Sequence, residues 1–235
     1  MSISAPHAEP VRGEREIHRV FNWLCLPAGL AFLLLGFLDC INFTVDDVFI
    51  SLRYAENLAC GSGLVFNDGQ RIEGFSNLLW TLLLAGLAKL GLSQRTSDLA
   101  LLISAKALGA GLGLATFLAV QWLLPRMQSW PKSQDRSSFS GLVLLSLGAS
   151  YSFTLWSVSG METPLCALAI TVAGGAYVLA LERLEQGKDS RRLLCLGGTA
   201  FGLAALARPE PIFIWVLAMA ALMFTVPTMT RRALA

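Results

Sequence analysis

Two adjacent carboxylates, Asp46 and Asp47, stand a few residues after the first apolar stretch of this 235-residue chain. Placing charge so close to hydrocarbon costs free energy, and the cost is more often tolerated where the charge serves a functional site. Thr44 and Asp47 also have the spacing of a capping box, which predicts a short helix whose positive end both carboxylates stabilise. A carboxylate at a helix start keeps an oxygen free to accept a proton or a metal ion, so the two interpretations are compatible.

A second residue capable of chemistry is Arg208, which stands between two apolar stretches and is followed by Pro-Glu-Pro. The two prolines predict that a helix ends at this level. Arg208 either belongs to a site at this break or extends to the membrane surface and pairs with Glu210.

The elements that position these residues are membrane helices. Hydrophobic residues make up 54% of the chain and charged residues 14%, an apolar share too large for a soluble domain of this size. The charges occur in short clusters between apolar runs of about span length, which predicts a helical bundle rather than a barrel of alternating strands. The net charge of +2 gives no indication of a nucleic-acid partner.

Seven apolar stretches are candidates for spans, and the second of them is the weakest. It has about 16 residues and carries Lys89, so it either crosses the membrane or lies in the interface. The stretches are 20–38, 77–92, 99–124, 139–158, 165–181, 193–207 and 211–227.

The distribution of Lys and Arg decides between the two topologies. If 77–92 does not cross and the N-terminus is inside, twelve basic residues lie in inner loops and five lie outside; a crossing reverses this bias. The inner set is Arg12, Arg15, Arg19, Arg126, Lys132, Arg136, Arg183, Lys188, Arg191, Arg192, Arg231 and Arg232, and the outer set is Arg53, Arg71, Lys89, Arg95 and Arg208. The sequence therefore predicts an all-α bundle of about six spans over 20–235, a cytoplasmic tail over 1–19, and an outer region over 39–98 that holds an interfacial helix.

Within the expected outer region, two segments rich in glycine predict a helix end and a turn. The Gly-Ser-Gly at 61–63 predicts the end of the helix that begins near Asp47. The Asn-Asp-Gly at 67–69 predicts a tight turn between two short extended pieces.

Three ordered motifs carry a family resemblance. The first is Asp46-Asp47-Val-Phe-Ile-Ser-x-Arg53-Tyr54-Ala-x-Asn57-Leu with Gly61-x-Gly63-Leu-Val-Phe-Asn67-x-Gly69-x-Arg71-x-Glu73-Gly74-Phe-Ser-Asn77-x-Leu-Trp80. It resembles the first outer loop of the GT-C superfamily of polytopic glycosyltransferases. The nearest branch contains the mycobacterial terminal arabinofuranosyltransferases; protein O-mannosyltransferases and lipid A aminoarabinose transferases are more distant. Ser-Gly-Met-Glu-Thr-Pro-Leu at 159–165 and Ala-Leu-Ala-Arg-Pro-Glu at 205–210 resemble two further motifs of the family.

This resemblance implies a reaction. A GT-C enzyme takes a sugar from a polyprenyl-phosphate donor in the bilayer and passes it to a hydroxyl of an envelope glycan, lipid or protein at the outer, periplasmic face of the inner membrane. The hydroxyl needs a base, and a carboxylate beside a second carboxylate has a raised proton affinity. We assign this role to Asp46, with Asp47 as the alternative. Arg208 is the cation expected to stabilise the departing phosphate.

Six other residues are expected to bind substrate, each with a structural alternative. One of them is Glu210, which contacts substrate beside Arg208 or only pairs with it. Lys106, seven residues into its span, contacts the phosphate or extends to the membrane surface. Glu162 joins the site or caps the helix that begins near Pro164. Arg53, Arg71 and Glu73 orient sugar or acceptor, or pair with one another.

The carboxylates Asp46, Asp47 and Glu162 could also gather around Mg²⁺ or Mn²⁺, although several branches of the family work without metal. Members of the nearest branch are usually much longer than this chain, with more spans and often a soluble outer domain. The resemblance therefore leaves two expectations: a second polypeptide supplies the C-terminal half, or the chain is a non-catalytic scaffold or partner subunit.

Overall fold

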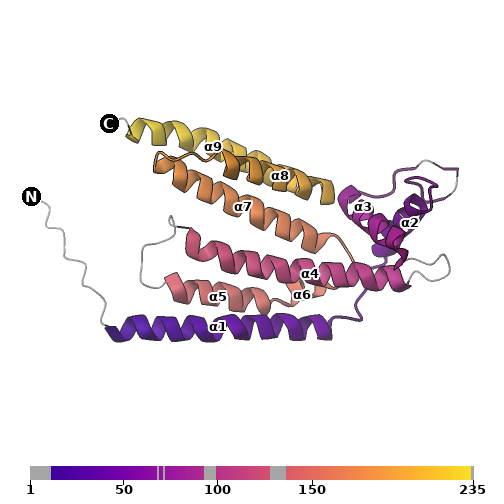
Figure 1. The fold of residues 1–235 in the computed structure, drawn as a ribbon, viewed down its shortest axis with the longest axis horizontal. Helices are drawn as coiled ribbons and strands as arrows, with labels where there is room; N and C mark the ends of the chain where they lie inside the picture. Colours follow the sequence, from indigo (N-terminus) through magenta and orange to yellow (C-terminus); the bar gives the residue numbers. More distant parts are fainter. Residues whose placement is uncertain (1–11, 68, 71, 93–98, 128–135, 234–235) are drawn as a thin grey trace, which may run out of the picture.

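The computed structural model describes residues 12–67, 69–70, 72–92, 99–127 and 136–233. These residues form helices joined by turns and loops, with no strand among them, which confirms the predicted all-α class. Long helices run side by side in an elongated bundle, and two short helices lie at one end of it (Figure 1). The predicted tail over 1–19 lies partly outside the described residues, and its portion from Arg12 onward forms the first turns of a helix.

Each predicted apolar stretch coincides with a helical segment, because runs of apolar residues ended by Gly, Pro or charge are local signals. The bundle consists of α1 (Arg12–Asp39), α4 (Leu99–Leu123), α5 (Arg136–Gly148), α6 (Tyr151–Ser157), α7 (Thr163–Glu185), α8 (Arg191–Ala207) and α9 (Pro211–Ala233). The short elements are α2 (Asp47–Ala59), α3 (Leu78–Leu87), the π-helical turn η1 (Ala88–Leu92) and the 3₁₀ turn η2 (Leu124–Arg126).

Two of the described helices are long and apolar enough to cross a membrane. They are Leu99–Arg126, which is α4 with η2, and Thr163–Glu185, which is α7. The pair α5 and α6 makes a third span if it crosses as one unit. Within the described part of the chain, the other apolar segments are shorter than these helices. The predicted count of six spans therefore stays a prediction.

The apolar stretch over 139–158 is not one continuous helix, and that it crosses the membrane as one span stays a prediction. Its two helices meet at an angle of 55°. The hydroxyl of Ser150 accepts a hydrogen bond from the backbone N–H of Phe153 and so caps α6. A serine that bonds the backbone locally competes with a continuous helix, and average hydropathy does not register this effect.

Close contact between helices depends on small residues in α1 and α5. A Cβ atom on Gly148 would overlap the backbone carbonyl of Gly29, and a Cβ on Gly29 would press on the backbone of Leu144. Small residues allow helix backbones to approach where hydrophobic burial from water does not drive association. Around this contact, Leu33, Phe37 and Phe117 are buried in one apolar cluster that joins α1, α4, α5 and α6.

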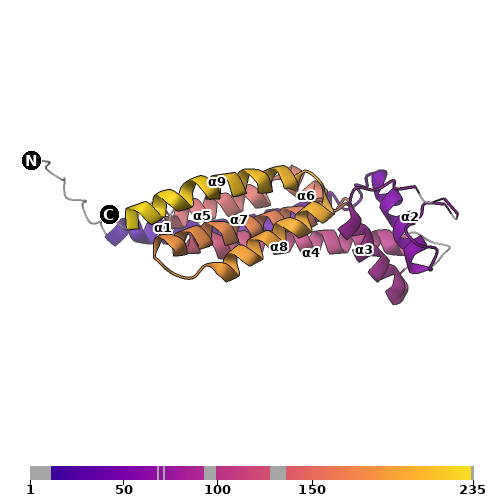
Figure 2. The same cartoon turned by 90° about the horizontal axis from the view of Figure 1, so that it is seen from above.

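The pair α2 and α3 forms a separate apolar cluster on the start of α4. Val48, Trp80 and Leu101 are fully buried there. Both views place α2 and α3 at one end of the bundle, outside its row of long helices (Figures 1 and 2). This is the arrangement expected if 77–92 lies in the interface. The membrane orientation of the outer region over 39–98 stays a prediction.

We predict that Gly148→Ala destabilises the protein by about 1–3 kcal/mol, because the added methyl group forces α1 away from α5. Gly111→Ala is the matched control, since a Cβ at Gly111 meets nothing within 4 Å. The measurement is reversible denaturation in detergent followed by circular dichroism. Equal stability of the two variants would contradict the close approach of α1 and α5.

Candidate functional site

Four segments far apart in the sequence meet at the end of the bundle where α2 and α3 lie. They are the first turns of α2, the residues before α3, the turn before α7 and the break after α8. Together they enclose a pocket of about 280 Å³. Its lining residues are Asp47, Ile50, Ser51, Gly74, Phe75, Ser76, Asn77, Met161, Glu162 and Arg208.

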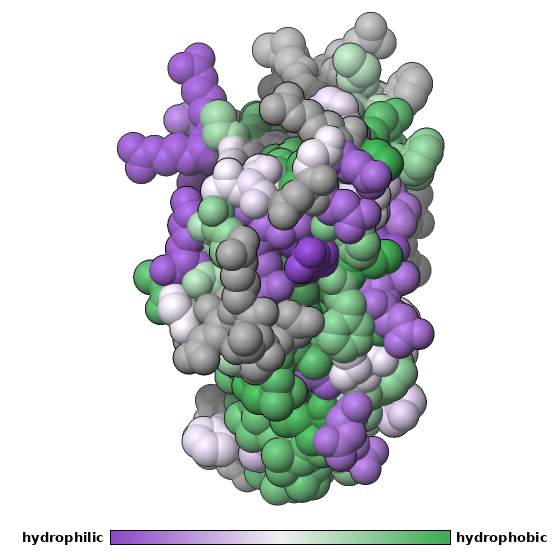
Figure 3. All heavy atoms as spheres, turned by 90° about the vertical axis from the view of Figure 1, so that its right-hand side faces the viewer, coloured by the Kyte–Doolittle hydropathy of each residue, from purple (hydrophilic) through white to green (hydrophobic). Residues whose placement is uncertain are grey.

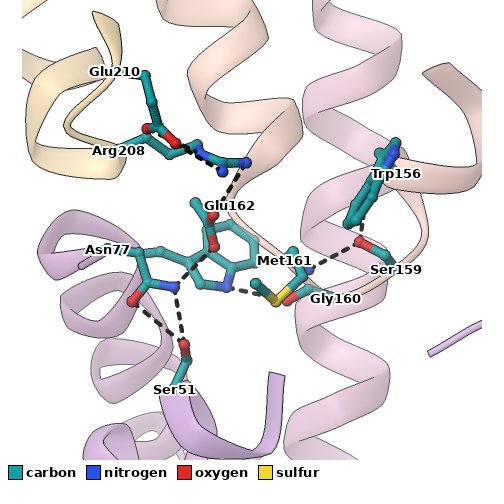
Figure 4. Close-up of polar contacts among 10 residues, drawn as sticks. Ser51, Asn77, Trp156, Ser159, Gly160, Met161, Glu162, Arg208 and Glu210 are labelled. Carbon is teal, nitrogen blue, oxygen red and sulfur yellow. Dashed lines mark hydrogen bonds and ion pairs between the residues drawn. The ribbon is translucent and has the colours of Figure 1, made fainter. Parts of the chain in front are cut away.

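Glu162 is the polar centre of this pocket, and it is 4% exposed. Its Oε2 accepts a hydrogen bond of 2.8 Å from Asn77 Nδ2, and its Oε1 lies 3.7 Å from Nη1 of Arg208 (Figure 4). A buried carboxylate is strongly unfavourable unless it is hydrogen-bonded and paired. Glu162 occupies the N-cap position of α7 but makes no side-chain capping bond. The expected capping role is therefore absent, and the side chain serves the pocket instead.

Asn77 connects Glu162 to α2. Its Nδ2 also donates to Ser51 Oγ at 2.9 Å, while its Oδ1 accepts from Ser51 Oγ at 3.3 Å and from Thr81 Oγ1 at 3.2 Å. All three residues are buried. In the sequence, Asn77 is recognisable only as part of a motif, and Ser51 gives no indication of a role. The sequence feature that could have indicated a role for Asn77 is its position as a polar residue next to an apolar helix, and this feature is common on protein surfaces.

The turn before α7 is held by Trp80, whose Nε1 donates to the carbonyl oxygen of Gly160 at 3.1 Å. Gly160 has φ +89°, a conformation that favours glycine, and a Cβ there would lie 2.9 Å from a methyl carbon of Val48. Next to it, the N–H of Met161 donates to Ser159 Oγ at 3.2 Å. These contacts fix the backbone immediately before Glu162 (Figure 4).

Arg208 lies between two carboxylates. α8 ends at Ala207, and Arg208 itself is extended, as the flanking prolines predict. Its Nη2 donates to Glu210 Oε1 at 3.0 Å and its Nε to Glu210 Oε2 at 3.3 Å, a bidentate pair. This hydrogen bonding lowers the pKa of Glu210 and raises the pKa of Arg208. The expected pairing with Glu210 is present, and Arg208 also belongs to the pocket.

The two aspartates are placed differently. The helix begins at Asp47, and Asp46 is its N-cap with helical dihedral angles and no side-chain capping bond, so the predicted capping box with Thr44 is wrong. The start of the helix at these carboxylates is confirmed. Asp47 is exposed and lines the pocket with Glu162 and Arg208, whereas Asp46 is not part of the lining. Of the two aspartates, the pocket thus contains Asp47, which the sequence offered only as the alternative to Asp46 for the role of base.

Three other predicted residues, Lys106, Arg53 and Glu73, do not line this pocket. Lys106 Nζ donates to the carbonyl oxygens of Ile41 at 2.8 Å and Phe43 at 2.6 Å, so it joins α4 to the segment after α1. Arg53 Nε donates to the carbonyl of Phe66 at 3.2 Å. Glu73 lines a neighbouring pocket of about 600 Å³, and Arg71 lies outside the described residues.

The carboxylates do not form a good cation site. Among the described residues, no group of three His, Cys, Asp or Glu side chains is close enough to hold a metal ion. Asp47 and Glu162 share the pocket, but both oxygens of Glu162 already contact Asn77 or Arg208. Asp47 and Glu162 alone are therefore a poor donor set for Mg²⁺ or Mn²⁺, and binding of such an ion stays an untested possibility.

Comparison with known proteins gives one informative similarity. No family model matches the chain, and no solved structure matches it. The chain is 29% identical over 199 residues to a terminal β-(1→2)-arabinofuranosyltransferase of Mycobacterium tuberculosis. The match covers 82% of this chain and 30% of the relative, so the chain spans less than a third of that protein's length. The similarity supports a distant relationship to a glycosyltransferase without defining the branch.

We predict that Asn77→Ala lowers the stability of the protein by about 1–3 kcal/mol, because it leaves the buried Glu162 without its closest donor. The matched control is Asn67→Ala, which removes an exposed hydrogen bond to Gln70. Chemical denaturation of the two variants in detergent, side by side, tests the difference. A loss in Asn67→Ala as large as that in Asn77→Ala would contradict an anchoring role for Asn77.

Proposed function

We propose that this chain forms the catalytic module of a membrane glycosyltransferase that moves a sugar from a polyprenyl-phosphate donor to a hydroxyl acceptor. The observation that carries the proposal is the pocket in which the exposed carboxylate of Asp47 and the cation of Arg208 face the same space. The distant relationship to a glycosyltransferase supports it. An acid–cation pair of this kind suits a transfer in which one group takes a proton and the other stabilises a leaving anion.

The position of the pocket suits a donor that stays in the bilayer. The pocket lies beside the start of α7, one of the two long apolar helices, and Arg208 stands directly after α8. Hydrophilic and hydrophobic side chains share this end of the molecule, as expected at a membrane interface (Figure 3). A donor with its prenyl chain among the helices would present its phosphate at the level of Arg208.

The distribution of charge supports an orientation with the pocket outside. Arg126, Arg183 and Arg191 stand at the end of η2, near the end of α7 and at the start of α8, which is the end of the bundle remote from α2 and α3 (Figure 1). Basic residues favour the cytoplasmic side. We therefore place the pocket at the periplasmic face of the inner membrane, where an envelope glycan, lipid or protein supplies the acceptor hydroxyl.

The proposed step uses two of the pocket's side chains directly. Asp47 accepts the proton of the acceptor hydroxyl while that oxygen attacks the anomeric carbon. The bond between the anomeric carbon and the phosphate oxygen breaks, and its electron pair leaves with polyprenyl phosphate. Arg208 stabilises the resulting negative charge, which is worth more in a region of low dielectric than in water.

The two carboxylates on Arg208 have different roles in this proposal. Glu162 is buried and hydrogen-bonded by Asn77, so it remains in place and orients the guanidinium. The side chain of Glu210 is 59% exposed, which makes its pairing the one that a donor phosphate can replace. The guanidinium group can donate its paired hydrogen bonds to either a carboxylate or a phosphate in the same geometry.

We predict that Asp47→Asn reduces the transfer rate by about 10²–10⁴-fold, because the amide cannot accept the proton. Asp46→Asn is the matched control, and it should retain activity close to that of the parent. The assay follows transfer from polyprenyl-phosphate arabinofuranose, and from a pool of other polyprenyl-phosphate sugars, to envelope extracts in lipid nanodiscs. A loss confined to Asp46→Asn would assign the base to Asp46 and contradict the role of Asp47.

We also predict that Arg208→Ala weakens binding of the donor by at least about tenfold, since a charge-assisted bidentate contact contributes about 1.5–3 kcal/mol. Arg53→Ala, which removes an equal charge outside the pocket, should leave donor binding unchanged. Binding is measured by native mass spectrometry without acceptor, so the result does not depend on a second polypeptide that completes the enzyme. Equal binding by the parent and Arg208→Ala would contradict the phosphate role.

A further inference from the structure

A second polar pocket lies at the opposite end of the bundle from the proposed catalytic site. It has a volume of about 580 Å³. Its lining residues are Trp122, Arg126, Leu179, Glu182, Arg183, Gln186, Lys188 and Leu193. They come from α4 with η2, from the last turns of α7, from the turn that follows and from the start of α8. The proposed glycosyl transfer makes no use of this pocket.

The pocket lies about one membrane thickness away from the catalytic site. α7 starts beside Glu162 and ends at Glu185, and its 23 residues correspond to a rise of about 34 Å. The hydrocarbon core of a bilayer is about 30 Å thick. If α7 crosses the membrane, this pocket therefore stands at the depth of the lipid headgroups of the opposite leaflet.

The charge of the lining is predominantly positive. Arg126, Arg183 and Lys188 supply three cations, and Glu182, which is buried, supplies the single carboxylate of the lining. The excess of positive charge faces a space large enough for a phosphate and part of a glycerol group. Such an arrangement attracts anionic headgroups, and basic pockets between helices on the cytoplasmic side are known to take them.

The guanidinium of Arg126 and the backbone of the turn that carries Lys188 are held by local contacts. The guanidinium of Arg126 stacks 4.1 Å from the ring centroid of Trp122, and its Nη1 hydrogen-bonds to the carbonyl of the same residue. The backbone N–H of Lys188 donates to the carbonyl of Arg183 at 2.9 Å, in a turn where Gly187 has φ +69°. Ser190, which is buried, ties this turn back to α7 through the carbonyl of Ala180 at 3.0 Å.

Trp122 adds an amphipathic element that is typical of the membrane interface. Trp122 is 54% exposed, although it belongs to a helix apolar enough to span the bilayer. Tryptophan is enriched at the level of the headgroups, where an apolar ring can contact acyl chains while polar neighbours meet water. Beside Arg126 it would contact the upper acyl region of a lipid whose phosphate is bound by the cations.

We propose that this pocket binds the phosphate of an anionic phospholipid in the leaflet opposite the catalytic site, with Arg126, Arg183 and Lys188 as its ligands. The inference concerns a site separate from the proposed glycosyl transfer and does not depend on it. A free phosphate ester offers the same chemistry, so the experiment must distinguish a lipid from a soluble source.

The test is native mass spectrometry of the full chain in detergent, titrated with phosphatidylglycerol or with phosphatidylcholine. We expect a phosphatidylglycerol adduct of the parent that binds roughly tenfold more tightly than phosphatidylcholine. We expect that preference to disappear in Arg183→Gln/Lys188→Gln. The matched control is Arg191→Gln/Arg192→Gln, which removes two exposed charges at the same end of the bundle but outside the pocket, and it should keep the preference.

Four results would overturn the proposal. One is the absence of any preference for phosphatidylglycerol in the parent, and the second is an equal loss in both double variants, which would indicate unspecific surface charge. The third is binding of glycerol 3-phosphate as tight as binding of the lipid, which would assign the pocket to a soluble phosphate ester. Lys188→Arg provides a check on folding: it retains the charge, so lipid preference should survive, and its loss would also contradict the assignment.

Discussion

The burial of one carboxylate, Glu162, is the constraint on which the candidate site depends. A carboxylate that is 4% exposed needs a hydrogen-bond donor or a counter-charge. Asn77, just before α3, donates a hydrogen bond to it, and Arg208, just after α8, forms an ion pair with it. These partners are distant in sequence, so satisfying one charge brings the segment before α3, the turn before α7 and the break after α8 to the same place. Asn77 extends the connection to Ser51 in α2. The pocket is the space that remains beside this connected group.

The long helices serve this arrangement by holding the three segments at one level. Their mutual contacts depend on small residues, most clearly where Gly148 of α5 meets Gly29 of α1, because apolar surfaces gain little from leaving a lipid environment. The bundle thereby has two chemically different ends. One carries the acid–cation pocket with α2 and α3, and the other carries a cluster of basic residues around Trp122. This asymmetry is the basis of the proposed orientation, because basic residues favour the cytoplasmic side.

Several features of the fold were predictable because their causes are local. Every apolar stretch is helical, the glycines after α2 ended that helix, and the prolines around Glu210 ended α8. Two features differ from the prediction, and both differences have causes at a helix start. The capping box at Thr44 did not form, since the helix begins only at Asp47. The stretch over 139–158 broke because Ser150 caps a new helix, an effect that hydropathy does not contain.

The sequence by itself determined the helical class, the positions of the helices and the identity of most charged residues near the site, because periodicity, composition and turn residues act over a few positions. Only the tertiary structure decided how those charges are used. In the tertiary structure, Asp47 rather than Asp46 lines the pocket, and Lys106 hydrogen-bonds to the backbone of the segment after α1. Asn77 holds the carboxylate of Glu162 through a hydrogen bond. The physical reason is that a polar side chain finds its partner through space. The hydrogen bond between Asn77 and Glu162 joins residues 85 positions apart, and no local sequence pattern predicts a contact over that separation.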